Sequence, residues 1–343
     1  MITKLTILIL LFLLITTFCY SQDSVNERKT TAPLLDSEGN IYVGCSDGQL
    51  YSLTGEGKNR WSFKSDGQLS SDLHILSDGT IYAYSGNDTL YALNTDGSLK
   101  TSYQKLGSFV PPAIGEDGTI YAGEEYQLKA YNKNREEQWR VVTRRQIVNV
   151  VVAGTGTIYT TAGTQITAIN PDGSTKWGNF LDKEDGSLYI PAADKNDNIY
   201  VCTSGSNFYS FDNQGNQLWK KTLYLPANVS PSVGADGTVY ICAESTLFAF
   251  NSDGSLSWSY RIKGFRNLSG PALAPDGTVY VSAGDFLYTM KNGKEVWNFN
   301  PEDNISKKPA IGKDGTIYVS TDNGGLLALT PDGTLKWSAV LGK

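Results

Sequence analysis

The sequence predicts an all-β fold, an eight-bladed β-propeller in which each blade is a four-stranded antiparallel sheet. Three observations indicate it: a tyrosine recurs eight times at intervals of 38 to 41 residues, a tryptophan follows at a matching place in seven copies, and no stretch has a helical pattern of useful length. Four short strands repeated about every 40 residues are typical of blades stacked around an axis. A linear β-solenoid is the second choice, because its rungs are usually shorter and its ends need caps.

Three positions define the repeat. The recurring tyrosines are Tyr42, Tyr82, Tyr121, Tyr159, Tyr200, Tyr240, Tyr280 and Tyr318. Nine residues earlier, Leu73 and Val150 occupy the position in copies two and four, and the other copies have Pro33, Pro112, Pro191, Pro231, Pro271 and Pro309. The tryptophans, which include every Trp in the chain, are Trp61, Trp139, Trp177, Trp219, Trp258, Trp297 and Trp337.

Each copy predicts four strands in chain order. The first strand carries the proline and is expected at the inner edge of the sheet, facing a central channel, because proline cannot donate to a sheet ladder. A tight turn such as Asp314-Gly315 leads to the second strand, and the third follows, as in residues 90–93. Both middle strands are apolar on both faces, which predicts that neighbouring blades cover each sheet on either side. The tryptophan of the fourth, outermost strand is expected to pack against the next blade.

Two details of the ring follow from this order. Thr101 replaces the tryptophan in the second copy, so the junction after blade 2 is predicted to be the weakest. The first copy begins with its first strand and the last copy ends with its fourth, so no sheet is shared between the two ends. We therefore expect the ring to close by packing between sheet faces.

Three segments are expected along the chain. Residues 1–21 have the pattern of an export signal, with a positive end, an apolar run over residues 5–18 and small residues before the cleavage point. The run is shorter than the about 20 residues that a spanning helix needs, so no transmembrane segment is expected in the mature chain. Residues 22–30 are a polar leader, and residues 31–343 form the propeller.

The export signal predicts an extracytoplasmic protein, either secreted or periplasmic. Lipid attachment at Cys19 is disfavoured, because the bulky Phe18 directly precedes it. The remaining cysteines, Cys45, Cys202 and Cys242, are interpreted as buried apolar side chains. Cys202 and Cys242 hold equivalent positions in neighbouring copies, and sheets about 10 Å apart are too distant for a disulfide there.

A run of alanine, glycine and tryptophan recurs within the copies, as in Ala168…Gly173…Trp177. Ser52 and Ser210 replace the alanine in blades 1 and 5, Arg135 replaces the glycine in blade 3, and blade 7 is one residue shorter with Thr289 first. This run resembles the tryptophan-docking motif of the PQQ-like (quinoprotein alcohol dehydrogenase-like) propeller repeats, and the chain is most similar to the non-catalytic, BamB-like branch of that family. The resemblance covers about residues 31–343 and implies an eight-bladed ring with a WD40/YVTN-like architecture.

Catalytic and metal-binding patterns are largely missing from the sequence. The quinone-dependent enzymes that this family includes often carry a pair of adjacent cysteines, and this chain has none. The single histidine, His74, excludes an HExxH zinc site and any multi-histidine metal centre. His74 lies among apolar residues of a predicted first strand, so we interpret it as structural or channel-facing. No catalytic, cofactor-binding or metal-binding residue is assigned, and the protein is predicted not to be an enzyme.

The two faces of the predicted ring differ. Turns after the first and third strands are short and nearly uniform, whereas the connections on the opposite face vary between copies. Functional residues favour variable connections on a rigid scaffold. We therefore expect a protein partner to bind the variable face, with basic residues near the channel mouth: Arg144, Arg145, Lys263, Arg266, Lys307 and Lys308.

The predicted function is that of an exported, non-catalytic and monomeric scaffold for protein binding or assembly. The net charge of −6 argues against a nucleic-acid partner, which would select a basic face. Two alternatives stay open: a PQQ-dependent dehydrogenase-like enzyme, and a propeller that binds a small ligand or glycan through Tyr189, Tyr224 and Phe265.

Overall fold

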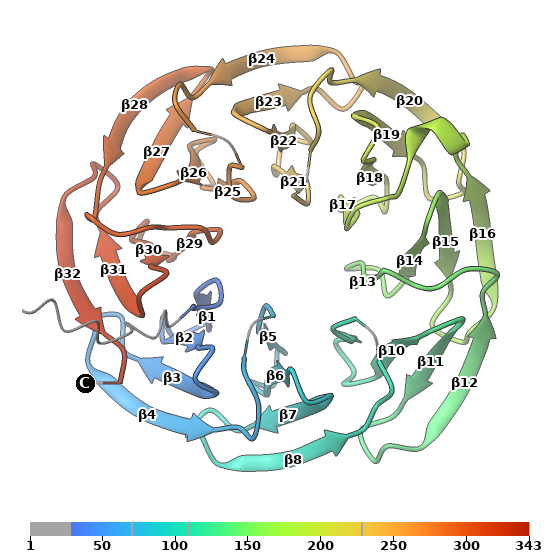
Figure 1. Ribbon diagram of the computed structural model, residues 1–343, viewed down its shortest axis with the longest axis horizontal. Coiled ribbons are helices and arrows are strands. Elements are labelled where there is room, and N and C mark those ends of the chain that lie inside the picture. The colour runs from blue at the N-terminus through green and yellow to red at the C-terminus, as the bar shows by residue number, and fades with distance from the viewer. Residues whose placement is uncertain (1–28, 70, 109, 228, 266, 343) are drawn as a thin grey trace, which may run out of the picture.

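The structure is a computed structural model that describes residues 29–342, apart from Ser70, Phe109, Asn228 and Arg266. The described residues form eight four-stranded antiparallel sheets, which stand as blades around a common axis (Figure 1). Each blade consists of four strands that are consecutive in the sequence and run from the inside of the ring to its rim. The predicted eight-bladed propeller is confirmed. The predicted signal at residues 1–21 lies outside the described residues.

The strands repeat in the same order around the ring. The innermost strands are β1 (Leu34–Leu35), β5 (His74–Ile75), β9 (Ala113–Ile114), β13 (Asn149–Val152), β17 (Ala192–Ala193), β21 (Ser232–Val233), β25 (Ala272–Leu273) and β29 (Ala310–Ile311). The second strands are β2 (Ile41–Gly44), β6 (Ile81–Ser85), β10 (Ile120–Glu124), β14 (Ile158–Ala162), β18 (Ile199–Cys202), β22 (Val239–Ala243), β26 (Val279–Ala283) and β30 (Ile317–Ser320). The third strands are β3 (Gln49–Leu53), β7 (Thr89–Leu93), β11 (Gln127–Tyr131), β15 (Gln165–Ile169), β19 (Asn207–Phe211), β23 (Thr246–Phe250), β27 (Phe286–Lys291) and β31 (Gly325–Leu329). The outermost strands are β4 (Asn59–Lys64), β8 (Leu99–Gln104), β12 (Glu137–Val142), β16 (Thr175–Phe180), β20 (Gln217–Thr222), β24 (Leu256–Arg261), β28 (Lys294–Phe299) and β32 (Leu335–Val340). A single turn of 3-10 helix, η1 (Lys183–Asp185), lies between β16 and β17.

The hydrophobic core is divided into layers between neighbouring blades. In the layer between blades 8 and 1, Ile41 and Val43 of β2 pack against Leu326 and Ala328 of β31. All four residues are fully buried, and similar clusters fill the other junctions. Cys45, Cys202 and Cys242 lie buried within these layers. Burial on both sides of each sheet explains why the middle strands carry apolar residues at consecutive positions.

The ring closes by face packing, as predicted, because blades 1 and 8 are separate sheets. Hydrogen bonds between described residues also join them, among them one from Lys313 Nζ to the Ser37 carbonyl at 2.9 Å. Trp337 donates from its indole to the Gly55 carbonyl at 2.9 Å, and Thr30 Oγ1 donates to the Thr321 carbonyl at 3.0 Å. The Ser320 hydroxyl donates to the Thr31 carbonyl at 2.8 Å. Thr30 is buried, so the described end of the predicted leader contributes to closure.

The tryptophans dock each blade onto the next, as predicted. Six indoles donate from Nε1 to a carbonyl in the turn between the third and fourth strands of the following blade, for example Trp139 to Pro171 at 2.8 Å. The glycine of that turn makes room for the ring: a Cβ on Gly173 would lie 2.6 Å from the Trp139 indole. Trp258 packs beside Gly293 in the shorter turn of blade 7.

The junction after blade 2 uses different contacts. Arg135 stands where the other blades have the indole-contacting glycine and keeps the same left-handed backbone, with φ of 65°. Its guanidinium donates to the Gln104 carbonyl in β8. The Tyr103 hydroxyl donates to the Lys133 carbonyl at 2.9 Å, at the turn position that accepts the indole bond elsewhere. Hydrogen bonds from Tyr103 and Arg135 therefore replace the indole hydrogen bond that Thr101 cannot make.

Candidate functional site

The ring has two chemically different faces. We call the face with the turns after the first and third strands the turn face. Its first-to-second strand turns share one hydrogen-bond pattern, as in blade 8, where the Gly312 amide donates to the Thr316 carbonyl at 2.8 Å. The opposite face, here called the connection face, carries segments that range from residues 143–148, between β12 and β13, to residues 181–191, between β16 and β17. The predicted contrast between uniform turns and variable connections is confirmed.

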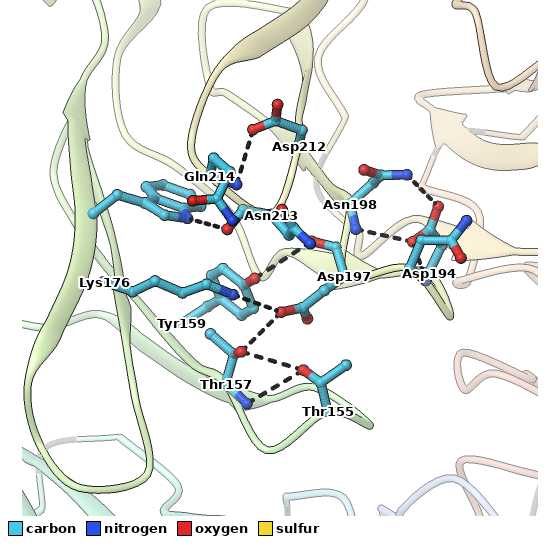
Figure 2. A network of polar contacts seen from close by, with 12 residues as sticks. Thr155, Thr157, Tyr159, Lys176, Asp194, Asp197, Asn198, Asp212, Asn213 and Gln214 are labelled. Carbon is cyan, nitrogen blue, oxygen red and sulfur yellow. Dashed lines mark hydrogen bonds and ion pairs between the residues drawn. The ribbon is translucent and has the colours of Figure 1, made fainter.

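The turn face also carries a buried polar network between blades 4 and 5, shown in Figure 2. Thr157 Oγ1 donates to the Asp197 carboxylate at 2.8 Å, and Lys176 Nζ lies 3.3 Å from the same oxygen. The Asp197 side chain is almost fully buried and stands where other turns have glycine, with φ of 65°. The network joins a turn of blade 5 to strands β14 and β16 of blade 4, so we assign it to ring stability.

The longest connection is fixed by a buried carboxylate. Asp185, in η1, is 2% exposed and accepts hydrogen bonds from the Tyr209 hydroxyl at 2.5 Å, from Lys220 Nζ at 3.2 Å and from the Asn207 amide. Burial alone raises the pKa of Asp185, but these hydrogen bonds outweigh it and hold the pKa below its usual value. Asp185 therefore stays ionised and anchors residues 181–191 to blade 5.

The basic residues predicted from the sequence are distributed around the connection face. Arg144 and Arg145 directly follow the outermost strand β12 and are exposed, as is Lys263 between β24 and β25. Lys307 is half-buried before β29, and Lys308 turns into a cavity on the axis. Arg266 lies outside the described residues. These residues lie at the junctions of blades 3–4, 6–7 and 7–8. The described basic residues are therefore separated around the face and do not form one patch.

The connection face also exposes large apolar side chains, which the sequence did not single out as a group. We call six of them the apolar sector, which extends from the β10–β11 turn to the β20–β21 connection; Val340, at the end of β32, is exposed outside it. The sector consists of Tyr126, Val142, Val148, Phe180, Ile190 and Tyr224. The Thr143 amide donates to the Tyr126 carbonyl at 2.7 Å, which places Val142 next to Tyr126. Isolated aliphatic residues such as Val148 and Ile190 look like core in the sequence, so only their exposure reveals the sector.

Tyr224 is the most exposed member of the apolar sector, with 88% of its surface accessible. Its backbone is left-handed, with φ of 57°, and a bulky side chain rarely adopts this conformation. The flanking Leu223 and Ala227 are buried in a cluster that Leu225 also joins. Buried neighbours thus hold the backbone while the tyrosine side chain points into solvent. Strain of this kind, which costs about 1–3 kcal/mol, often marks a functional position.

The three aromatic residues considered for ligand binding do not form one site. Phe265 is half-buried and packs against Phe286, with ring centroids 5.7 Å apart. Tyr189 packs against the same cluster as Leu225. Only Tyr224 of the three is freely exposed.

Two cavities follow the axis of the ring. One of about 400 Å³ is lined by the inner strands of blades 6–8 and contains Lys308 and Ser232. The other, of about 480 Å³, is lined mainly by blades 2–4 and contains Asp72 and His74. His74 is exposed in this cavity, and partial burial lowers its pKa. The channel-facing interpretation of His74 is confirmed.

Metal and membrane features were also sought in the described part of the chain. There, no three His, Cys, Asp or Glu side chains are placed together so as to hold a metal ion. Within residues 29–342, leaving aside the four uncertain positions, no helix has the length and apolar character that a membrane span requires.

Comparison with known proteins identifies the repeat. A family model described as outer membrane protein assembly factor BamB matches residues 21–109, 46–187, 98–232, 162–282 and 243–343. No curated protein sequence matches the chain.

Solved structures share the fold at low sequence identity. BamB from Moraxella catarrhalis is 16% identical, with a TM-score of 0.69, covering 87% of this chain and 92% of that one. The quinohemoprotein alcohol dehydrogenase ADHIIG from Pseudomonas putida HK5 is 13% identical, with a TM-score of 0.70, over 88% of this chain and 70% of that one. The C-terminal WD40 domain of Sif2 is 14% identical, with a TM-score of 0.70, over 85% of this chain and 92% of that one.

Proposed function

The chain belongs to the family of the outer membrane protein assembly factor BamB, and from this premise we propose that it is an exported, non-catalytic propeller that binds a protein partner through its connection face. The observation that carries the proposal is the apolar sector. An exposed apolar patch typically marks an interaction site, and the six side chains of the sector lie over blades 3 to 5 of the connection face, whereas those near the turn face are single residues at the starts of outermost strands. The turn face has a different task, because its repeated bonds hold the blades together.

Tyr224 is the anchor of the proposed interface. Tyrosine, tryptophan and arginine supply most of the binding energy at protein interfaces, usually near the centre of the contact. Buried neighbours already fix the backbone at Tyr224, so little backbone order has to be gained on binding. Arg144 and Arg145 follow Val142 after a single threonine and add exposed guanidinium groups next to apolar surface. Lys263, Arg266 and Lys307 remain proposed contacts at the edge of this interface.

The family also supports the location. The name of the matching family places its members in outer membrane assembly, and the apolar run at residues 5–18 is the pattern of an export signal. We therefore propose that the protein acts outside the cytoplasm, in the periplasm or secreted, and the monomer expected from the sequence stays a proposal.

Affinity capture from the native envelope, using the purified full chain as bait, tests the interface. Two variants carry the test: Val142→Ser with Tyr224→Ser, and Arg144→Ser with Arg145→Ser and Lys263→Ser. Leu256→Ser with Leu335→Ser is the matched control, because both leucines are about as exposed as the apolar sector but lie on outermost strands near the turn face.

We expect a defined partner of the wild-type chain to be recovered equally with the control and at least about tenfold less with the Val142/Tyr224 variant, which corresponds to about 1.4 kcal/mol. The basic variant should lower recovery by a smaller factor. Thermal midpoints should match the wild type throughout. Equal recovery with all variants contradicts the proposed interface.

A further inference from the structure

Two opposite charges stand at the same position of the repeat near the axis. Lys308 and Asp72 each lie ten residues before the recurring tyrosine of their copy, next to the innermost strands β29 in blade 8 and β5 in blade 2. Figure 1 shows these two strands on either side of β1 at the inner edge of the ring. The other six copies carry no charge at this position, where they have Ala32, Pro111, Asn149, Ile190, Ser230 and Gly270. This level of the axis therefore has one cation and one anion.

Neither charge is fully paired. Lys308 Nζ donates to Ser232 Oγ at 3.0 Å, and that hydroxyl donates onward to the Pro271 carbonyl at 2.7 Å. Two of the three ammonium donors thus remain free among the described residues. The Asp72 carboxylate acts electrostatically on Lys308, but within the described chain the two form no ion pair at 4.0 Å or less. Asp72 likewise has no hydrogen bond to a described residue.

The surroundings of both charges are apolar but reached by water. Near Lys308 the wall consists of Pro231, Ala272 and Leu273. The Lys308 side chain keeps contact with solvent in the cavity, while the enclosing wall partly desolvates the ammonium and lowers its pKa. A charge with apolar walls and few partners interacts more strongly with a bound counter-charge than one on an open surface.

The wall near Asp72 offers room for an apolar group. Val110, Pro112, Val148 and Ile190 line this second cavity, together with the polar Asn149. A ligand that reaches both charges therefore meets apolar side chains beside each of them.

We propose that the axis of the ring binds a small apolar zwitterion, such as a short peptide with free termini, with its carboxylate on the Lys308 ammonium, which Ser232 holds in place, and its ammonium on Asp72. Two separate charges of opposite sign select for a ligand that carries both. The apolar walls favour an aliphatic side chain over a polar one. Val148 and Ile190 of the apolar sector also line this cavity, whereas Val142 and Tyr224, which are substituted to test the partner interface, do not.

Isothermal titration with the dipeptide Ala-Leu tests this site, using N-acetyl-Ala-Leu, which keeps only the carboxylate, and Ala-Leu amide, which keeps only the ammonium. The variants are Lys308→Met and Asp72→Asn, and Lys307→Met is the matched control at the neighbouring lysine. Both target side chains are exposed in the cavity, so the variants should fold, and thermal midpoints verify this.

We expect Ala-Leu to bind the wild type and Lys307→Met equally. The wild type should bind each blocked peptide at least about tenfold more weakly than Ala-Leu, a difference of about 1.4 kcal/mol. Lys308→Met and Asp72→Asn should each bind Ala-Leu more weakly than the wild type by the same factor. The proposal is overturned if Ala-Leu does not bind saturably at millimolar concentration. It is also overturned if a blocked peptide binds as well as the free one, or if Lys307→Met weakens binding as much as Lys308→Met.

Discussion

The turn face and the connection face of the ring come from the same repeat but follow different rules. On the turn face, each blade must accept the outer strand of the blade before it, so the same glycine, carbonyl and indole recur at most junctions. On the connection face no such contact is repeated, and segment length, charge and exposure vary. The comparison teaches that substitutions on the turn face should cost stability, while those on the connection face should cost binding.

The largest expected effect is at Trp219, the most buried of the indoles, which packs on Phe208 with ring centroids 5.1 Å apart. Trp219→Ala should lower the free energy of unfolding by about 3–5 kcal/mol, because it leaves a cavity between blades 5 and 6. Chemical denaturation measures the change. The neighbouring Leu218 is 49% exposed, and Leu218→Ala should change stability by less than about 0.5 kcal/mol. Equal losses in the two variants contradict indole docking.

The next effect is at the glycine beneath an indole. Gly173→Ala should cost about 1–3 kcal/mol, because the new methyl group meets the Trp139 ring and φ is 86°. Gly154→Ala is the control, since a Cβ there has no neighbour within 4 Å. The same denaturation assay compares them, and a Gly173 variant as stable as the control speaks against close contact with the ring.

The exceptional junction after blade 2 allows a test by restoration. Thr101→Trp alone should destabilise by about 1–2 kcal/mol, because Arg135 places a Cβ where the other junctions have none. Adding Arg135→Gly should recover this loss, with a coupling free energy of about 0.5–3 kcal/mol in a double-mutant cycle. Purely additive effects indicate that Thr101 and Arg135 do not form a pair equivalent to tryptophan and glycine.

A smaller effect is expected at Tyr103. Tyr103→Phe removes the hydrogen bond to the Lys133 carbonyl and should cost about 1 kcal/mol. Tyr126→Phe serves as the control on an exposed tyrosine and should be neutral. If denaturation shows that neither substitution changes stability, the Tyr103 hydrogen bond does not replace the indole hydrogen bond that is missing at Thr101.

The smallest effect on stability is expected on the connection face. Tyr224→Ser removes an almost fully exposed side chain and should change the free energy of unfolding by less than about 0.5 kcal/mol. A loss of more than 2 kcal/mol in the denaturation assay gives Tyr224 a structural role and removes it from the proposed interface.

Much of the fold was predictable, because each feature is repeated. The tyrosine, proline and tryptophan positions recur often enough to determine the number of blades, the order of strands and the direction of docking. Thr101 was recognised as an exception, but its replacement by Tyr103 and Arg135 was not, because it depends on contacts between two blades that occur only once.

The candidate site was less predictable. The sequence indicated the variable face, but exposure of Val142 and Ile190 depends on how each connection crosses the ring. Asp72 and Lys308 are far apart in the sequence and approach each other only when the ring closes between blades 8 and 1. The sequence of one repeat therefore does not predict that these two charged side chains lie near each other.

Photo-crosslinking in the native compartment tests the central claim most directly. A photoreactive residue is placed at position 224 on the connection face and, in a separate variant, in place of Gln214, which is exposed on the turn face (Figure 2). We predict a discrete crosslinked protein from position 224 and none from position 214. Crosslinks of the same kind and yield from both positions, or from position 214 alone, contradict binding through the connection face.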